Sequence, residues 1–334
     1  MKDYYDVIIV GASISGMEAA SELSKTNLSV LVVEREKEIG NKACAHGITG
    51  SDLSLLPKEL INSDLQKLTI HYKDKEVEFP KRGAIISSID RKKYLNHKFD
   101  ELKKAENIDF MLGSSARVLS SSEVQVGDLT LKTKYIIGAD GSNSLVRKYL
   151  SLGSKRMGAG IHYMVPRKFD KFEIFFDDKL FGTGYAWIFP NENFTSVGCG
   201  GEIDVMPAKK LQDNFALWLK REEIDVSDSV FQGCGMNCDY QGYKFGNIFL
   251  VGDAAGLISS LTGKGMNPGI VSARQVVNEI TGKKLKRNLV KESLKKKRKQ
   301  ELFMPFLRNA FWRSILFTVM IRLLNHLKYK PKEV

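Results

Sequence analysis

The 334-residue sequence contains little cysteine and little histidine. Its four cysteines, Cys44, Cys199, Cys234 and Cys238, are too few for a disulfide framework in a chain of this length. Cys234 and Cys238 form a single C-x3-C pair with no histidine nearby, which favours structural thiols over a metal site, so no metal is expected. The five histidines are scattered, and no set of nucleophile, histidine and carboxylate can be assigned.

Targeting signals and long uncharged apolar segments are also lacking. The first residues, "MKDYYDVIIVG", enter a strand at once and show none of the basic, apolar and cleavage regions of a signal peptide. Near the C-terminus, the longest charge-free run lies between Arg313 and Arg322 and has eight residues, which is too short to span a bilayer. We therefore expect a cytoplasmic protein, with peripheral attachment at the inner face of the membrane left open.

Positive charge is abundant, but it is concentrated in one segment. Of 51 lysines and arginines and 39 acidic residues, residues 283–332 hold sixteen basic and two acidic ones, which leaves 35 basic and 37 acidic residues elsewhere. This distribution argues against a nucleic-acid-binding body. Three uses of the basic segment stay open: an interfacial helix on an anionic membrane, a helix packed over the rest of the protein, and a docking site for an acidic ferredoxin.

The N-terminal sequence has the pattern of a βαβ unit. "YDVIIV" and "LSVLVVE" are short β-branched runs typical of buried strands, and "GMEAASELSKT" between them has helical composition. The turn before that helix holds Gly11 and Gly16, with Ser13 where a dinucleotide-binding loop has its second glycine. Glu34 ends the second strand, where a carboxylate accepts hydrogen bonds from a ribose. This context favours a nucleotide site over an ordinary turn.

Two later stretches add small-residue loops after apolar strands. In "IIGADGSNSLVRKYL", the pattern D-G-x-x-S-x-x-R is formed by Asp140, Gly141, Ser144 and Arg147. In "VGDAAGLISSLTGKGMNPG", Asp253 ends a strand and small residues would let the backbone lie against a flat ligand. Each loop alone is a weak signal of a ligand-binding site. The three loops in this order are a specific one.

The remaining pattern predicts an α/β fold with an insertion. We expect a Rossmann-like nucleotide-binding domain from residues 1–150 and 246–285, with helices at 91–105 and about 267–281. Residues 151–245 are rich in aromatics, glycine and strand-like runs, which predicts an inserted, mostly antiparallel β substrate domain. Residues 286–334 form a basic and apolar C-terminal helical segment. No internal repeat and no second glycine fingerprint is found, so no dedicated nicotinamide-binding domain is expected.

The three loops resemble the FAD-binding fingerprints of the para-hydroxybenzoate hydroxylase-like flavoproteins. Within that superfamily, "NKACAHGI", "GYAWIFP" and "GLISSLTGKGMNPGI" are similar to motifs of the geranylgeranyl reductase family. The resemblance covers residues 1 to about 285, and Ser13 departs from it because the family pattern has glycine there. It implies FAD as the cofactor, with the glycine loop at residues 11–16 around the pyrophosphate and Glu34 on the ribose. The cofactor-binding residues it implies are Gly11, Ser13, Ser15, Gly16, Glu34, Arg35, Cys44, Ala45, Gly47, Arg91, Ala116, Asp140, Gly141, Asp253, Gly263, Gly265, Met266 and Asn267.

The resemblance further implies a reductase that hydrogenates carbon–carbon double bonds of a polyprenyl (geranylgeranyl) group on a lipid or quinone precursor. Its electrons would come from NAD(P)H or a ferredoxin. Such chemistry needs a dry apolar pocket, and strand alternation places Tyr185, Trp187 and Phe189 on one side of a strand as its walls. Cys44 is the expected catalytic residue, as a proton donor or a group that orients the alkene.

Two other function classes stay open. One is an FAD-dependent monooxygenase or halogenase on the same fold, in which the reduced flavin reacts with oxygen. The other is a non-enzymatic prenyl-binding protein like the GDP-dissociation inhibitors, which do not use FAD. The loops that carry Glu34, Asp140 and Asp253 argue against the second alternative.

Overall fold

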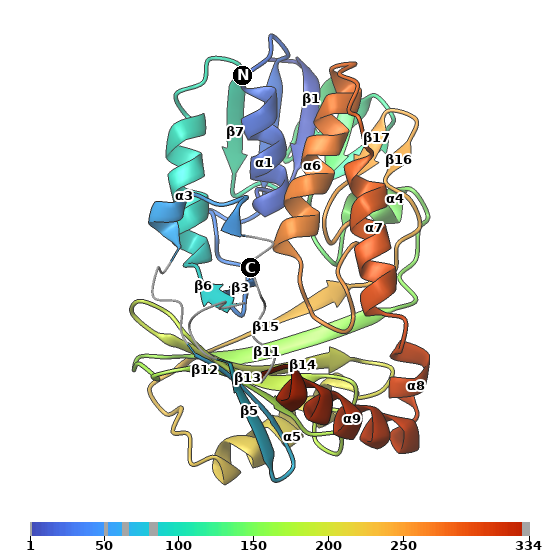
Figure 1. Cartoon of the computed structure of the whole chain (residues 1–334). Coiled ribbons are helices and arrows are strands. Elements are labelled where there is room, and N and C mark those ends of the chain that lie inside the picture. The colour runs from blue at the N-terminus through green and yellow to red at the C-terminus, as the bar shows by residue number, and fades with distance from the viewer. Residues whose placement is uncertain (1, 50–52, 62–66, 80–85, 329–334) are drawn as a thin grey trace.

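Two β-sheets lie one above the other in Figure 1, and the chain passes between them repeatedly. The computed structural model describes residues 2–49, 53–61, 67–79 and 86–328. The upper sheet in the figure has a parallel centre, and the lower sheet is mostly antiparallel. Residues from both parts of the chain line the cavities that lie between the sheets.

The first sheet has eight strands, of which five run parallel in the order β17-β10-β1-β2-β7. The strands are β1 (Tyr4–Val10), β2 (Val30–Glu34), β7 (Ile108–Leu112), β8 (Ala116–Ser120), β9 (Glu123–Val126), β10 (Leu129–Gly138), β16 (Lys244–Phe245) and β17 (Ile248–Leu250). Val7 and Ile9 face one layer, while Ile8 and Val10 face the other. Both faces are covered, which explains the nearly continuous apolar runs in β1 and β2.

Helices cover both faces of this sheet. On one face pack α1 (Ile14–Leu23), α3 (Arg91–Leu102) and α6 (Met266–Ile280). On the other face pack α4 (Leu145–Tyr149), the β8–β9 hairpin and the start of α7 (Leu289–Gln300). Since α1 directly follows β1, its N-terminus lies at the carboxyl edge of the parallel strands, where doubly wound folds bind ligands.

The second sheet has seven strands in the order β15-β11-β14-β13-β12-β4-β5. The strands are β4 (Leu68–Tyr72), β5 (Lys75–Phe79), β11 (Met157–Val165), β12 (Phe172–Phe176), β13 (Tyr185–Pro190), β14 (Thr195–Glu202) and β15 (Val230–Asn237). One face is covered by α5 (Ala208–Arg221), which buries Leu211, Phe215 and Trp218 against it. A short pair, β3 (Gly47–Thr49) with β6 (Ile86–Ser88), and a 3-10 turn at Lys58–Leu60 complete the body.

The C-terminal helices α8 (Met304–Arg308) and α9 (Ala310–Lys328) lie against the β4–β5 end of the second sheet (Figure 1). Phe317 and Ile321 of α9 pack with Tyr72 and Val77. Of the three uses considered for the basic segment, packing against the rest of the protein is therefore observed for this face of α9. The last six residues of the segment lie outside the described residues.

The predicted α/β, Rossmann-like fold with a β-rich part and C-terminal helices is confirmed. The two predicted helices are present as α3 and α6, although α3 ends at Leu102 and not at 105. One assignment is corrected: β4 and β5 lie within the range given to the nucleotide-binding domain, but β4 pairs with β12 in the second sheet. The partner of β4 is about a hundred residues away in the chain, so a local pattern could not show it.

Candidate functional site

Two adjoining cavities lie at the carboxyl edge of the parallel strands. We call them the large cavity, of about 870 Å³, and the small cavity, of about 400 Å³. Ser13, Lys42, Arg91, Gly141 and Cys234 are among the residues that line both, so the cavities meet at the N-terminus of α1. Together they form one elongated binding site.

The turn between β1 and α1 requires glycine at two positions. Gly11 has a φ of +102°, and a Cβ there would lie 2.6 Å from the carbonyl oxygen of Ala139. A Cβ on Gly16 would lie 2.0 Å from the carbonyl oxygen of Gly11. Ser13 caps α1, because its Oγ accepts a hydrogen bond from the Gly16 amide, and it lies 2.9 Å from Ser15 Oγ. The first turn of α1 thus presents amides and hydroxyls at the junction of the cavities.

The small cavity contains the carboxylate that ends β2. Glu34 Oε2 accepts a hydrogen bond from the Ala12 amide at 2.8 Å, which ties the end of β2 to the glycine turn. The other predicted residues that line this cavity are Gly11, Ser13, Arg35, Arg91, Ala116, Asp140 and Gly141. Ala116 therefore lies with Glu34, at the end of the site away from β13.

The D-G-x-x-S-x-x-R segment holds the walls of the site together. Asp140 accepts hydrogen bonds from the Leu145 and Val146 amides, and burial raises the pKa of this carboxyl. Ser144 caps α4. Arg147 is buried and donates to the carbonyl oxygens of Ala254, Gly153 and Asp239, so it links the third loop to the second sheet.

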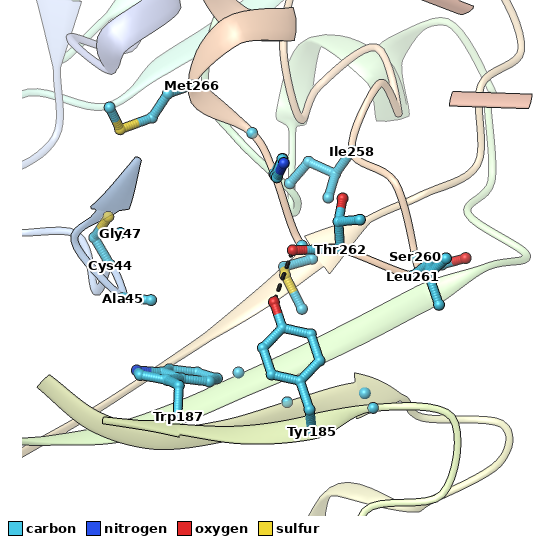
Figure 2. A pocket seen from close by; sticks show the side chains of 18 of the residues that line it. Cys44, Ala45, Gly47, Tyr185, Trp187, Ile258, Ser260, Leu261, Thr262 and Met266 are labelled. Atoms are coloured by element: carbon cyan, nitrogen blue, oxygen red, sulfur yellow. Dashed lines mark hydrogen bonds between the residues drawn. The ribbon is translucent and has the colours of Figure 1, made fainter. Parts of the chain in front are cut away.

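Two loops face one another across the large cavity (Figure 2). One carries Cys44, whose Sγ accepts a hydrogen bond from the His46 amide at 3.3 Å. The other runs from β17 into α6, and its Asp253 accepts a hydrogen bond from Lys42 Nζ at 2.8 Å across the cavity. The predicted residues on these loops that line the large cavity are Cys44, Ala45, Gly47, Asp253, Gly263, Gly265 and Met266. Asn267 is the second residue of α6 and lines neither of the two cavities.

The strand β13 supplies an aromatic floor to the large cavity. Tyr185, Trp187 and Phe189 line it, whereas Ala186 and Ile188 pack with α5 on the opposite face, as the alternation predicted. The Tyr185 hydroxyl donates to the carbonyl oxygen of Thr262 at 2.8 Å (Figure 2). Burial raises the pKa of Tyr185 to about 12, so the hydroxyl stays protonated.

Among the lining residues that the sequence reasoning missed, three carry a thiol or an imidazole. Cys234, interpreted as a structural thiol, lines both cavities, and burial raises its pKa. His46 and His162 also line the large cavity, and burial lowers the pKa of both, that of His162 to about 4. Strand alternation places Cys234 and Met236 on one face of β15, but no local signal shows that this face meets a ligand.

The far part of the large cavity is lined by the C-terminal helices. These residues are Phe303, Leu307, Leu316, Phe317, Val319, Met320, Leu323 and Leu324. All are apolar, and Phe317 among them packs against Phe176 of the second sheet. Among the described residues, no helix is long and apolar enough to cross a membrane, and no three histidine, cysteine or acidic side chains are grouped as a metal site requires.

The arrangement fits FAD. A long ligand can lie across both cavities, with its pyrophosphate at the α1 N-terminus, because a helix N-terminus presents backbone amides and a partial positive charge. Arg91 Nη1 donates to the Lys42 carbonyl, while its buried Nε has no partner among the described residues. The adenosine end would lie beside Glu34 and Ala116, and the flavin end between the Cys44 loop and the loop before α6.

Comparisons with known proteins agree with this geometry. The family model described as Glucose inhibited division protein A matches residues 6–172, half of the chain. Digeranylgeranylglycerophospholipid reductase 3 of Methanosphaera stadtmanae is 27% identical over 323 residues, which cover 84% of this chain and 78% of that protein.

Two solved structures show the same fold. A geranylgeranyl bacteriochlorophyll reductase-like protein from Thermoplasma acidophilum matches with a TM-score of 0.70 at 19% identity, covering 97% of this chain and 90% of that one. The p-nitrophenol 4-monooxygenase PnpA of Pseudomonas putida DLL-E4 matches with a TM-score of 0.73 at 14% identity, covering 99% and 95%. The fold is thus shared by proteins named as reductases and as monooxygenases.

Proposed function

Because the chain belongs to the Glucose inhibited division protein A family of flavoproteins, and within the FAD-dependent oxidoreductases to the geranylgeranyl reductase family, we propose that it reduces carbon–carbon double bonds of a polyprenyl group. The polyprenyl group would be carried by a lipid or a quinone precursor. The named reductase relatives support this substrate class, and their low identity leaves the particular lipid to experiment.

The observation that carries the proposal is the shape of the large cavity. One end lies between the two loops that would hold the flavin, and the other is lined by apolar side chains of α8 and α9. Between the ends lie Tyr185, Trp187 and Phe189. An extended, flexible hydrocarbon chain would be desolvated along its whole length, which favours binding of a polyprenyl group over a small polar molecule.

Reduction of an alkene needs a hydride on one carbon and a proton on the other. FAD, when bound and reduced, supplies the hydride. The chain must hold the double bond against the flavin, exclude water and provide the proton. Trp187 and Phe189 would hold the alkene from below, and Trp187 is itself fixed by donating from Nε1 to Ser196 Oγ at 3.0 Å.

We propose that the Cys44 thiol donates the proton to the second carbon of the alkene. His46 and His162 are poor candidates at neutral pH, because burial lowers their pKa and keeps them uncharged. The Tyr185 hydroxyl is occupied by the Thr262 carbonyl. Cys44 lies on the loop that faces the flavin end of the cavity, and solvent can return its proton because the side chain is not fully buried.

The test is an anaerobic spectrophotometric titration. The FAD-loaded protein is reduced separately with NADPH, NADH and reduced ferredoxin, which identifies the electron donor, and a geranylgeranylated lipid is then added without oxygen. The proposal predicts reoxidation of the flavin by the lipid. If the flavin stays reduced with every prenyl lipid and is instead reoxidised by oxygen in a lipid-stimulated reaction with an oxygenated or halogenated product, the monooxygenase or halogenase alternative holds.

A further inference from the structure

Exposed apolar side chains are concentrated on the C-terminal helices. Of seventeen large apolar residues that are exposed in the described part of the chain, eight lie between residues 302 and 323. We call these eight the apolar patch: Leu302, Phe303, Phe306, Phe311, Trp312, Ile315, Val319 and Leu323. The other nine are scattered along the chain, as is usual for single exposed residues, whereas a patch of this kind marks an interaction surface.

The helix α9 is apolar on two faces. Its inner face buries Phe317 and Ile321 against the second sheet. Its outer face repeats Ile315, Val319 and Leu323 every fourth residue, where a helix on the surface of a water-exposed protein carries polar side chains. The outer face is therefore not explained by the packing of the chain itself.

The patch is held in place by polar contacts at its base. Arg308 Nε and Nη2 donate to the two carboxylate oxygens of Glu202 at 2.8 and 3.0 Å. The buried Arg313 donates to the carbonyl oxygens of Leu307 and Asp178. Tyr72 donates to Ser314 O at 3.2 Å. The exposed aromatic residues thus project from a fixed platform.

Positive charge adjoins this platform. The helix α7 leads into α8 on the right side of the molecule in Figure 1, and α9 runs from α8 across the second sheet. The exposed residues of α7 include Lys291, Lys295, Lys296, Arg298 and Lys299. Two copies of the chain that met through their patches would bring two strongly basic segments together and repel each other. An anionic surface would be attracted by the same charges.

The apolar patch is continuous with the large cavity. Phe303, Val319 and Leu323 are exposed and also line the cavity, so they mark its opening. A chain that enters there meets Phe317 and then the aromatic floor of β13, which line the same cavity.

We propose that the apolar patch inserts into the interface of an anionic lipid bilayer, with the basic residues of α7 on the headgroups, so that the large cavity opens into the membrane. The proposal that the protein docks on a membrane depends only on the observed surface. The purpose of docking, which is to deliver a membrane-held prenyl chain to the flavin, rests on the proposed function. Exposed Trp and Phe side chains beside lysines favour the membrane–water interface of an anionic bilayer.

The test is sedimentation of the FAD-loaded protein with vesicles. Vesicles of phosphatidylcholine with about 30% phosphatidylglycerol are compared with pure phosphatidylcholine, at low salt and at about 0.5 M salt. The proposal predicts binding to the anionic vesicles that weakens in high salt. It also predicts that the double variant Phe311→Ser, Trp312→Ser lowers the partition coefficient by roughly tenfold or more, because two interfacial aromatics are lost.

Matched variants complete the design. Phe231→Ser with Leu217→Ser removes exposed apolar residues of the second sheet and α5, and binding should remain within about twofold of the original protein. Lys295→Glu with Lys299→Glu should abolish the preference for anionic vesicles, whereas Lys104→Glu with Lys148→Glu should not. FAD content and the thermal midpoint check that each variant is folded.

The proposal is overturned if the original protein does not bind anionic vesicles, or if the Phe311 and Trp312 variant binds them as well as the original. It is also overturned if that variant instead dissociates a dimer in sedimentation velocity while vesicle binding is unchanged, because the patch would then be a contact between copies. The proposed function is tested separately. If the protein binds vesicles but does not reduce detergent-dispersed prenyl lipids, the docking proposal stands and the proposed function is rejected.

Discussion

At the residue scale, the serine in the first glycine loop is explained by its position. Ser13 caps α1 with its hydroxyl and borders both cavities, so a small polar side chain is accommodated where the family pattern has glycine. Gly11 and Gly16 have no such freedom, because a Cβ at either would collide with backbone atoms. The sequence alone could identify the loop, but only the backbone carbonyls of Ala139 and Gly11 show that Gly11 and Gly16 cannot be replaced.

This difference predicts opposite outcomes for two substitutions. Gly11→Val should weaken FAD binding by roughly a hundredfold or more, because valine at a φ of +102° is strained and its Cβ would meet the Ala139 carbonyl. Ser13→Gly should leave affinity within about threefold or improve it, since glycine is an acceptable N-cap. FAD affinity is measured by flavin fluorescence on variants whose circular dichroism matches the original. Normal FAD binding by Gly11→Val would show that the pyrophosphate is placed wrongly.

The role assigned to Cys44 can be separated from that of the second thiol in the cavity. Cys44→Ser should slow flavin reoxidation by the prenyl lipid by about a hundredfold, because serine is a much weaker acid than cysteine. FAD content should not change. Cys234→Ser is the matched control, and it should retain the rate within a few-fold. Equal losses in both variants would argue that neither thiol is the specific proton donor.

The buried histidine His162 should make stability depend on pH. Its pKa is about 4 in the folded protein, against 6.5 for an ordinary histidine, so below pH 6.5 the unfolded chain binds a proton that the folded protein does not. The stabilisation is complete above pH 6.5 and is lost as the pH falls towards 4, by up to roughly 3 kcal/mol. Urea unfolding at pH 7 and pH 4.5 should therefore show a smaller pH effect in His162→Gln than in the original.

At the scale of elements, local periodicity predicted the strands and helices that carry the site, but not their partners. The alternation in β13 correctly separated the cavity face from the α5 face. The assignment of β4 and β5 failed because their pairing depends on β12, far away in the chain. The contribution of α8 and α9 to the cavity was missed for the same reason: two apolar faces on one helix look alike in sequence, and only the fold distinguishes the face on the sheet.

The packing of α9 on β4 gives a test of that distinction. Phe317 is buried, with its ring centroid 5.5 Å from that of Tyr72 and 4.9 Å from that of Phe176. Phe317→Ala should lower the free energy of unfolding by about 3 kcal/mol, because it leaves a cavity between helix and sheet. Phe311→Ala, on the outer face of the same helix, should change it by less than about 0.5 kcal/mol. Equal effects in urea unfolding would mean that α9 does not hold this orientation.

At the scale of the whole molecule, function depends on how three distant parts meet. The parallel sheet presents the α1 N-terminus, the second sheet provides the aromatic floor, and the C-terminal helices complete the apolar end of the large cavity. The motifs in the sequence identified the first two parts, and the resemblance connected them to FAD. The cavity itself could not be predicted, because it is formed by residues from 13 to 324 whose proximity is set by the assembled fold.

The central claim is that this assembly places a prenyl double bond against a reduced flavin. The most direct measurement is the mass of the product after an anaerobic single turnover, in which stoichiometric reduced, FAD-loaded protein meets a geranylgeranylated glycerophospholipid. The account predicts a product heavier by two hydrogens for each flavin reoxidised. A lipid recovered with unchanged mass, or one that gains oxygen only when air is admitted, would contradict it.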